Sequence, residues 1–407
     1  MTEPGDISSG LGRAFADPAV HRDPYPFYAR AREEAPLLEL VVPEHPLGRL
    51  WLVTRYEDVQ VVLGDHRRFS SDARSLYGPG PEGAPEPSML SQDPPNHTRL
   101  RGRVAHDFTP KRVAAMRPSI ERMVDERVER LLEGGEFDLI GELALPVPVL
   151  VICELLGVPE GEEREQLAFW SKEFIDSSGV GNTGENVKER NEAANMALAS
   201  YFASLVQRKQ AEPDGALISA LLQPAEGEEP LSFPELVSMC VLLLVAGHET
   251  TVNLIGNGVR TLLRHHSEWE RLVADPGLVA SAVEECLRFE PPVQRGLFRI
   301  SLGPVELSGG RLEVDQQVLA AIGSANRDPS VFSDPDVFDV AREPNRHLSF
   351  GRGVHFCLGA PLARLEAQLV LRSLVERAPE LRVVGRDDDW RPSTLFRGLR
   401  QLCVARA

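Results

Sequence analysis

The sequence predicts a mainly helical protein with a minor β region. Apolar residues recur at helical spacing in several long segments, at residues 113–132, 145–156 and 193–209. A still longer helical pattern begins near Ser232 and continues to about His265. By contrast, the segments that resemble strands are few and short. These observations favour a fold built of helices, with strands confined to two parts of the chain.

The strands are expected near the N-terminus and again in the last third of the chain. Near the N-terminus, two short strands and then a short helix are predicted at residues 38–42, 50–54 and 57–63. Later, a helix over residues 278–289 stops before Pro291 and Pro292, because proline cannot continue a helix. The last predicted elements are two strands and a long helix, at residues 298–307, 317–322 and 360–377.

The long helix has its own start signal and an apolar middle. Ser232 and Glu235 fit a capping box, with Pro234 in the first turn. At about 1.5 Å per residue, the helix would be roughly 50 Å long. The run at residues 241–245 is apolar, which predicts that the helix crosses the core. Neither an internal repeat nor an interdomain linker is visible. The length alone suggests two or three domains, and a single large domain is the alternative.

The composition is that of a globular protein and argues against several functions. The chain has 407 residues, of which 42% are hydrophobic and 26% charged, and its formal net charge is −17. Such a negative charge argues against a nucleic-acid binder and against docking on an anionic membrane. We expect no segment to meet the length and hydropathy of a bilayer span, and the N-terminus lacks the pattern of a secretory signal. Five cysteines, an odd number without close pairs, favour a reduced, cytoplasmic location.

Two segments rich in glycine and other turn-forming residues are predicted to be loops, at residues 78–87 and 176–184. Loops of this length in a compact chain are often lids or binding loops. The alternative is that both are surface loops without a role in binding.

The strongest chemical pattern lies at residues 350–359, Phe-Gly-Arg-Gly-Val-His-Phe-Cys-Leu-Gly. A single cysteine is in most proteins a small buried apolar residue. Here, however, Cys357 follows a glycine-rich loop and precedes a predicted helix, whose N-terminal amides and dipole favour a thiolate. A sulfur presented in this way suits an axial ligand of a metal.

This segment resembles the haem-binding loop of the cytochrome P450 superfamily of haem-thiolate monooxygenases, and the chain is similar to the soluble bacterial members. The resemblance implies a single domain over residues 1–407 and a triangular prism of helices around a buried haem b, with Cys357 as the axial ligand of the iron. It also implies an enzyme that uses dioxygen to hydroxylate or epoxidise a small organic molecule.

Two helical segments match the same family in the expected order. Glu285 and Arg288 resemble its E-x-x-R motif, for which the family implies a buried ion pair completed by Arg342. Taken alone, a glutamate and an arginine at this spacing would be an ordinary pair on an exposed helix face.

The segment Ala246–Thr251, half-way along the long helix, resembles the oxygen-activation segment of the family. The resemblance places Ala246 against the haem and implies that Glu249 supplies protons, which Thr250 orients. His248 is expected to face away from the haem. Taken alone, the segment would be a polar kink in a core helix.

The other haem contacts follow from the resemblance. Haem carries two propionates, and charge-assisted hydrogen bonds to carboxylates are strong. The family implies that histidine and arginine side chains bind the propionates and that apolar side chains flank the ring. The expected haem contacts are Leu90, His97, Arg101, Ala246, Arg299, Phe350, His355 and Cys357.

No flavin or iron–sulfur module is visible, so electrons are expected to come from NAD(P)H through separate proteins. The family implies a ferredoxin and a ferredoxin reductase. Because ferredoxins are acidic, docking needs a local basic patch, for which the candidates are Arg67, Arg68, Arg103, Lys111, Arg112, Arg352 and Arg364. We expect a cytoplasmic monomer that binds neither nucleic acid nor a membrane.

The residues expected over the haem by family topology are mostly apolar: Leu242, Val245, Ala246, Val293, Gln294, Leu395 and Phe396. They favour a large, mostly apolar secondary metabolite such as a polyketide or a macrolide. Arg74 and Arg295 either pair with a polar group of the substrate or point to solvent or to a propionate. Three alternatives stay open: a peroxide-dependent haem enzyme, a haem-binding sensor without catalysis, and an enzyme whose substrate is tethered to a carrier protein.

Overall fold

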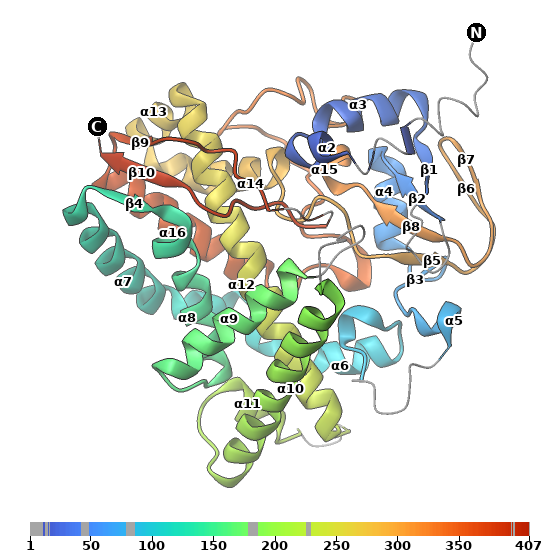
Figure 1. Ribbon diagram of the computed structural model, residues 1–407, viewed down its shortest axis with the longest axis horizontal. Helices are drawn as coiled ribbons and strands as arrows, with labels where there is room; N and C mark the ends of the chain where they lie inside the picture. Colours follow the sequence, from blue (N-terminus) through green and yellow to red (C-terminus); the bar gives the residue numbers. More distant parts are fainter. Residues whose placement is uncertain are drawn as a thin grey trace.

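The computed structural model describes residues 11–12, 15, 17–41, 49–78, 86–177, 186–224, 229–391, 393 and 395–406. Long helices dominate it, and the strands form small sheets on two opposite sides of the view (Figure 1). The predicted class, mainly α with a minor β region, is therefore confirmed. Of the two predicted loops, residues 79–85 and 178–184 lie outside the described part of the chain.

The helices are, in chain order, α2 (Pro18–Arg22), α3 (Tyr25–Glu34), α4 (Tyr56–Gly64), α5 (Arg74–Tyr77), α6 (Asn96–Ala105), α7 (Pro110–Gly134), α8 (Pro146–Leu156), α9 (Glu162–Asp176), α10 (Val187–Ala211), α11 (Leu217–Leu221), α12 (Phe233–Arg264), α13 (His266–Ala274), α14 (Val279–Phe289), α15 (Ile322–Ala325) and α16 (Ala360–Arg377). The strands are β1 (Leu37–Val41), β2 (Arg49–Val53), β3 (Phe69–Ser70), β4 (Glu136–Asp138), β5 (Arg299–Ser301), β6 (Val305–Leu307), β7 (Gly310–Leu312), β8 (Gln317–Ala320), β9 (Leu381–Val383) and β10 (Cys403–Arg406).

The main sheet brings the N-terminal strands together with strands from the last third of the chain. Its strand order is β1-β2-β8-β5-β3, and a second sheet has the order β4-β10-β9. The prediction of one strand over residues 298–307 is wrong, because the chain forms two strands there, β5 and β6. Gly303 and Pro304 lie between them, and proline lacks the N–H that would continue a ladder.

Helix α12 is the central element, and its start is the predicted one. The Ser232 hydroxyl accepts from the Glu235 N–H, and the Glu235 carboxylate accepts from the Ser232 N–H, so both halves of the capping box are present. The expectation that no segment reaches the length and hydropathy of a membrane span is wrong for α12. However, 67% of its apolar window is buried inside the structure, so the apolar residues fill the protein core.

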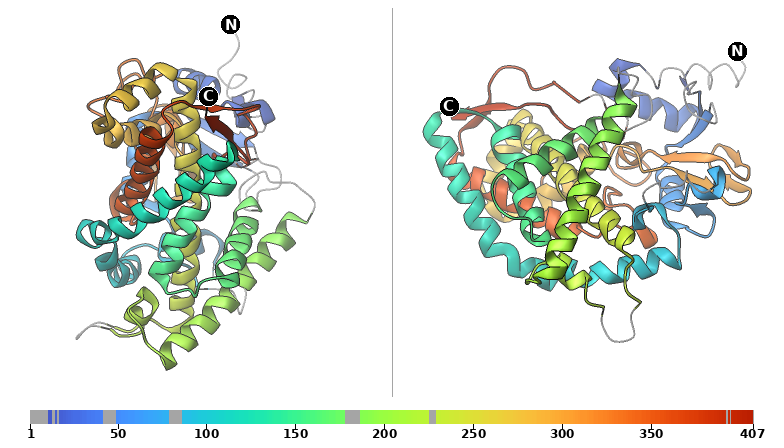
Figure 2. Two further views of the ribbon diagram at one scale, coloured as in Figure 1. Left: turned by 90° about the vertical axis from the view of Figure 1, so that its left-hand side faces the viewer. Right: turned by 60° about the horizontal axis from the view of Figure 1, so that its bottom comes forward.

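The packing around α12 brings distant parts of the chain to one place. Helices α8 and α10 pack on it from one part of the chain, and α14 and α16 from another. After α16, the C-terminal segment turns back and crosses α12, as the red trace over the yellow helix shows (Figures 1 and 2). Segments that lie far apart in the chain thus meet around the middle of α12.

Candidate active site

The loop before α16 fixes the position of the Cys357 sulfur. The Cys357 N–H donates to the Phe350 carbonyl at 2.8 Å, which closes the loop on itself. Gly353 has a φ of +70°, and a Cβ there would lie 2.6 Å from the Gly64 carbonyl oxygen of α4. Only glycine fits both demands. The loop is therefore locked between α4 and α16, with Cys357 near the helix start.

Opposing effects act on the Cys357 thiol. Burial raises the pKa of the thiol, while the N–H groups of Gly359 and Ala360 and the charge of Arg101 lower it less strongly. The N–H groups at the helix start thus favour the thiolate, as expected, but burial outweighs them in the protein by itself. A bound metal cation changes this balance, because a coordinating thiol loses its proton outright. The loop thus presents a partly buried sulfur that suits a metal cation.

Four basic side chains gather beside this loop. The rings of His97 on α6 and His355 lie 4.3 Å apart. Arg299 on β5 is 5% exposed, and burial lowers its pKa to about 10. Burial, then the charges of Arg299 and His97, lowers the pKa of His355 to about 3. Arg101 completes the group, and its guanidinium donates to the Phe356 carbonyl at 2.7 Å.

The described part of the chain supplies no carboxylate that forms an ion pair with Arg101 or Arg299. Asp93 is the nearby acid, but it accepts from the Ser70 hydroxyl at 2.5 Å and from the Ser71 N–H at 2.9 Å. The Nδ1 atom of His97 is buried without a hydrogen-bond partner. Buried basic groups normally have partners. The cluster therefore suits a ligand with anionic groups.

The middle of α12 borders an opening in an otherwise buried helix. Ala246 is exposed and Leu242, Val245 and Thr250 are half-buried, while the residues of the next turns are buried. The Thr250 hydroxyl donates to the Ala246 carbonyl at 3.1 Å. His248 is fully buried on another side, with its Nδ1 at 2.8 Å from the Leu244 carbonyl. The predicted oxygen-activation segment thus presents Ala246 and Thr250, and not His248, to the opening.

A buried network anchors α14 to the segment that leads into the Cys357 loop. The Arg288 guanidinium forms two bonds with the Glu285 carboxylate, both at 2.7 Å, and both side chains are fully buried. The Arg342 guanidinium donates to the same carboxylate at 3.2 Å. Asn345 and the Asp339 N–H also donate to it. The structure therefore brings together the three residues of the expected network.

Comparisons with known proteins agree with this geometry. The family model described as cytochrome P450 matches residues 178–379. Cytochrome P450 107B1 of Saccharopolyspora erythraea is 42% identical over 403 residues, which cover 95% of this chain and 96% of that protein. The chain belongs to the cytochrome P450 family.

Two solved structures show the same fold over nearly the whole length of the chain. The polyketide synthase cytochrome P450 PksS of Bacillus subtilis has a TM-score of 0.87 and 36% identity, over 96% of this chain and 98% of that chain. The structure of P450BioI in complex with an acyl carrier protein that carries hexadec-9Z-enoic acid has the same TM-score and identity, over 96% of this chain and 100% of that chain.

The chain is thus a P450 monooxygenase that carries haem b, and the site fits that group. Cys357 suits the axial position, and the orphaned His97 atom with its basic neighbours suits the propionates. Ala246 is exposed on α12, and its small side chain suits contact with a flat ring. Leu90, in a short turn over residues 89–91, is half-buried, and so is Phe350, over whose ring the Arg364 guanidinium lies at 4.4 Å.

The residues expected around the substrate of this P450 are brought together only in part. Val293 forms an isolated β-bridge with Phe396, and the Gln294 N–H donates to the Leu395 carbonyl at 2.8 Å. The Gln294 side chain, however, is buried and donates to the Tyr25 hydroxyl at 3.2 Å. The sequence analysis grouped Gln294 with the mostly apolar residues expected over the haem. Its side-chain amide, however, points toward α3.

Sequence reasoning missed a functional candidate, Arg391. Its guanidinium forms an ion pair with the Glu249 carboxylate, and the side chains are 9% and 2% exposed, respectively. A signal for this contact exists in the sequence of α12. Polar residues recur there along one stripe, and each contacts the C-terminal segment: Glu249, Asn253, Asn257 and Arg260. Polar residues at such spacing on a core helix predict a buried polar partner.

Proposed function

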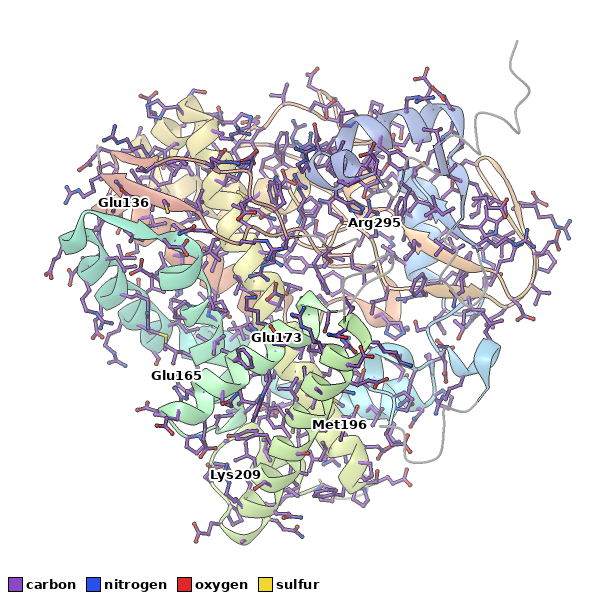
Figure 3. All side chains as sticks on the ribbon, in the orientation of Figure 1. Glu136, Glu165, Glu173, Met196, Lys209 and Arg295 are labelled. Atoms are coloured by element: carbon purple, nitrogen blue, oxygen red, sulfur yellow. The ribbon has the colours of Figure 1, made fainter. Side chains whose placement is uncertain are left out.

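We propose that this P450 hydroxylates or epoxidises a large, uncharged and mostly apolar molecule of the polyketide or macrolide class. The observation that carries the proposal is that both candidate arginines are engaged elsewhere. Arg74 pairs with Asp72 at 2.6 Å. Arg295 lies over the Phe15 ring at 4.4 Å, beside the N-terminal helices (Figure 3). A substrate carboxylate would therefore find no ready cation from either residue.

The side chains at the opening support the same substrate class. Leu242, Val245 and Phe396 are apolar and partly accessible. The segments 79–85 and 178–185, which lie outside the described residues, contain neither lysine nor arginine in their sequence. A neutral, apolar substrate gains free energy by leaving water for such surroundings, and an unpaired anion loses it. The similarity to PksS, a polyketide synthase P450, points in the same direction.

The acid and the hydroxyl of α12 favour dioxygen chemistry over the peroxide-dependent and sensor alternatives. Haem, when bound, supplies the iron at which dioxygen is reduced. This reduction consumes protons, which an apolar pocket lacks. The Thr250 hydroxyl is fixed at the opening by its bond to the Ala246 carbonyl, and Glu249 is the next residue along the helix. We infer that Glu249 supplies protons and that Thr250 orients them.

We infer that the electron donor is a ferredoxin, reduced by NAD(P)H through a reductase. Phe356 is 42% exposed directly before Cys357. Of the candidate basic residues, Arg67, Lys111, Arg112 and Arg352 are exposed, whereas Arg364 is paired with Glu284. Exposed basic side chains together with an exposed apolar side chain suit an acidic protein partner. We further propose that the enzyme is a cytoplasmic monomer with one domain.

An optical titration of the purified ferric protein tests the substrate class. The probes are neutral macrolactones, their ring-opened carboxylates and terpenoids of similar size, with Cys357→Ser as the control for the resting spectrum. We expect a thiolate-ligated resting spectrum and a shift from low to high spin with the neutral macrolactones alone. A shift with the carboxylates alone would contradict an uncharged substrate. No shift with any free compound, from a sound resting spectrum, would favour a substrate tethered to a carrier protein.

A further inference from the structure

A buried serine contacts one of the four basic side chains beside the Cys357 loop. Ser71 directly follows β3 and is 9% exposed. Its hydroxyl oxygen lies 3.0 Å from the Nε2 atom of His355. Ser71 is not among the haem contacts that the sequence predicts, whereas His355 is. The hydroxyl is therefore placed to orient an expected haem contact from behind.

The pairing of β3 with β5 brings Ser71 next to a second member of the basic group. The two strands are antiparallel neighbours in the main sheet (Figure 1), and Ser70 lies opposite Ile300. The same register, continued by one residue, places Ser71 opposite Arg299. Residues directly opposite each other in antiparallel strands have their side chains on the same face. Ser71 and Arg299 therefore face the same side of the sheet.

Asp93 fixes the backbone of Ser71 without using the Ser71 hydroxyl. The Asp93 carboxylate accepts from the Ser71 N–H at 2.9 Å and from the Ser70 hydroxyl at 2.5 Å. The Asp93 carbonyl accepts from the His97 N–H at 3.0 Å, at the start of α6. One acid thus ties the end of β3 to the helix that carries His97. The Ser71 hydroxyl stays available to His355, which is its hydrogen-bond partner in the described structure.

The contact at Nε2 decides what the other ring nitrogen of His355 offers to a ligand. A neutral imidazole carries one N–H, whereas a protonated one carries two. A hydroxyl can donate to Nε2 of the neutral ring or accept from Nε2 of the protonated ring. In both cases the Nδ1 atom carries a hydrogen that it can donate to a carboxylate. Without the hydroxyl, the neutral ring has no partner that favours this tautomer over the one with a lone pair at Nδ1.

We propose that Ser71 is a positioning residue for haem binding, which holds the His355 ring at Nε2 and leaves the Nδ1 N–H to a haem carboxylate. The proposal rests on His355 as a haem contact, which is expected from the sequence. A partner on one ring nitrogen fixes both the orientation of the ring and the hydrogen on the other nitrogen. Asp93 holds Ser71 in place, so the strand and the helix that flank the basic group act on His355 together.

Ser71→Ala tests the proposal, because it removes the hydroxyl and keeps the N–H bond to Asp93. The haem-loaded variant should lose haem to apomyoglobin about threefold to tenfold faster than the wild type, which is the effect typical of one hydrogen bond. Ser71→Thr keeps the hydroxyl and should retain haem as the wild type does. Ser373→Ala is the matched control, since Ser373 is 3% exposed and donates to the Asp125 carboxylate at 2.7 Å, between α16 and α7.

A spectroscopic readout separates positioning from a general loss of stability. In resonance Raman spectra of the ferric haem-loaded protein, the propionate bending band reports the hydrogen bonds of the haem carboxylates. The band should shift in Ser71→Ala and stay in place in Ser71→Thr and Ser373→Ala. An unshifted band in Ser71→Ala would overturn the proposal. Equal rates of haem loss in Ser71→Ala and Ser373→Ala would overturn it too.

His355→Leu separates the proposal from the haem contact on which it rests. If His355→Leu retains haem as the wild type does, His355 is not a haem contact and the proposal falls with it. If His355→Leu loses haem faster, but Ser71→Ala has the same effect in both backgrounds, His355 remains a haem contact and the role of Ser71 is overturned. An effect of Ser71→Ala that disappears in the His355→Leu background supports both, because residues that act through one contact are not additive.

Discussion

Two buried glutamate–arginine pairs of this P450 have the same chemistry and different surroundings. Five donated bonds reach the Glu285 carboxylate, and they use both of its oxygens. In the described structure, two bonds reach the Glu249 carboxylate, and both end on Oε1. Arg391 of the second pair also lines a hollow, whereas Glu285 and Arg288 are both fully buried.

The difference indicates which ion pair is held in place and which ion pair is able to open. A buried charge is stable only when its bonds are satisfied, and each missing bond lowers the cost of leaving. Glu285 would lose all five bonds at once if it moved, and its side chain is fully buried. Glu249 would lose two, and its partner Arg391 lines a hollow. The first pair is suited to hold the segment before Cys357, and the second is suited to open during turnover.

The largest effect is expected from Glu285→Ala. This change leaves Arg288 buried without its carboxylate, which costs roughly 3–5 kcal/mol of unfolding free energy. We expect little haem-loaded protein, as measured by the ratio of haem to protein absorbance after purification and by urea unfolding. Glu306→Ala is the control, because Glu306 is 77% exposed on β6 and changes there typically stay within about 0.5 kcal/mol. Normal haem loading of Glu285→Ala would refute the network as an anchor.

A smaller effect, confined to turnover, is expected from Thr250→Ala. The variant should bind haem and substrate as the wild type does, but it should divert electrons to peroxide because the hydroxyl at the opening is gone. The measurement is product and peroxide formed per NAD(P)H consumed. Thr251→Ala is the matched control, since Thr251 bonds to the Gly247 carbonyl in the same way but is 2% exposed. Unchanged coupling in Thr250→Ala would count against the relay.

The two pairs also differ in how far the sequence predicted them. Glu285 and Arg288 lie three residues apart, so a local motif predicts their pairing. Glu249 and Arg391 are 142 residues apart, and their contact depends on how the C-terminal segment crosses α12. The helix pattern and the capping box at Ser232 are likewise local, and the structure confirms them. The break at Gly303 and Pro304 was local too, but the alternation of apolar and polar residues on both sides of it resembled one strand.

The smallest effect is expected at a third, half-exposed pair beside the Cys357 loop. Burial alone would raise the pKa of Glu284, but bonds from Arg364 and His347 outweigh it and lower the pKa to about 2. Because the pKa in the folded state is depressed, this carboxylate stabilises the protein above its ordinary pKa of 4.5, and the contribution is lost as the pH falls toward about 2.

Glu284→Gln should therefore cost about 1 kcal/mol at pH 7, as partly exposed ion pairs do. The difference from the wild type should shrink steadily below pH 4.5. Urea unfolding at a series of pH values measures it. A cost that stays constant down to the lowest pH would show that packing, and not the charge of Glu284, is responsible.

The most direct test compares Glu249→Gln with Glu285→Gln in one preparation scheme. Both changes remove a single buried negative charge and keep the shape of the side chain. Haem content, melting temperature and product formed per NAD(P)H are measured for each. The account predicts that Glu285→Gln loses haem and stability, whereas Glu249→Gln keeps its haem and loses coupling to product. Haem loss in Glu249→Gln with intact coupling, or full haem loading and stability in Glu285→Gln, would contradict it.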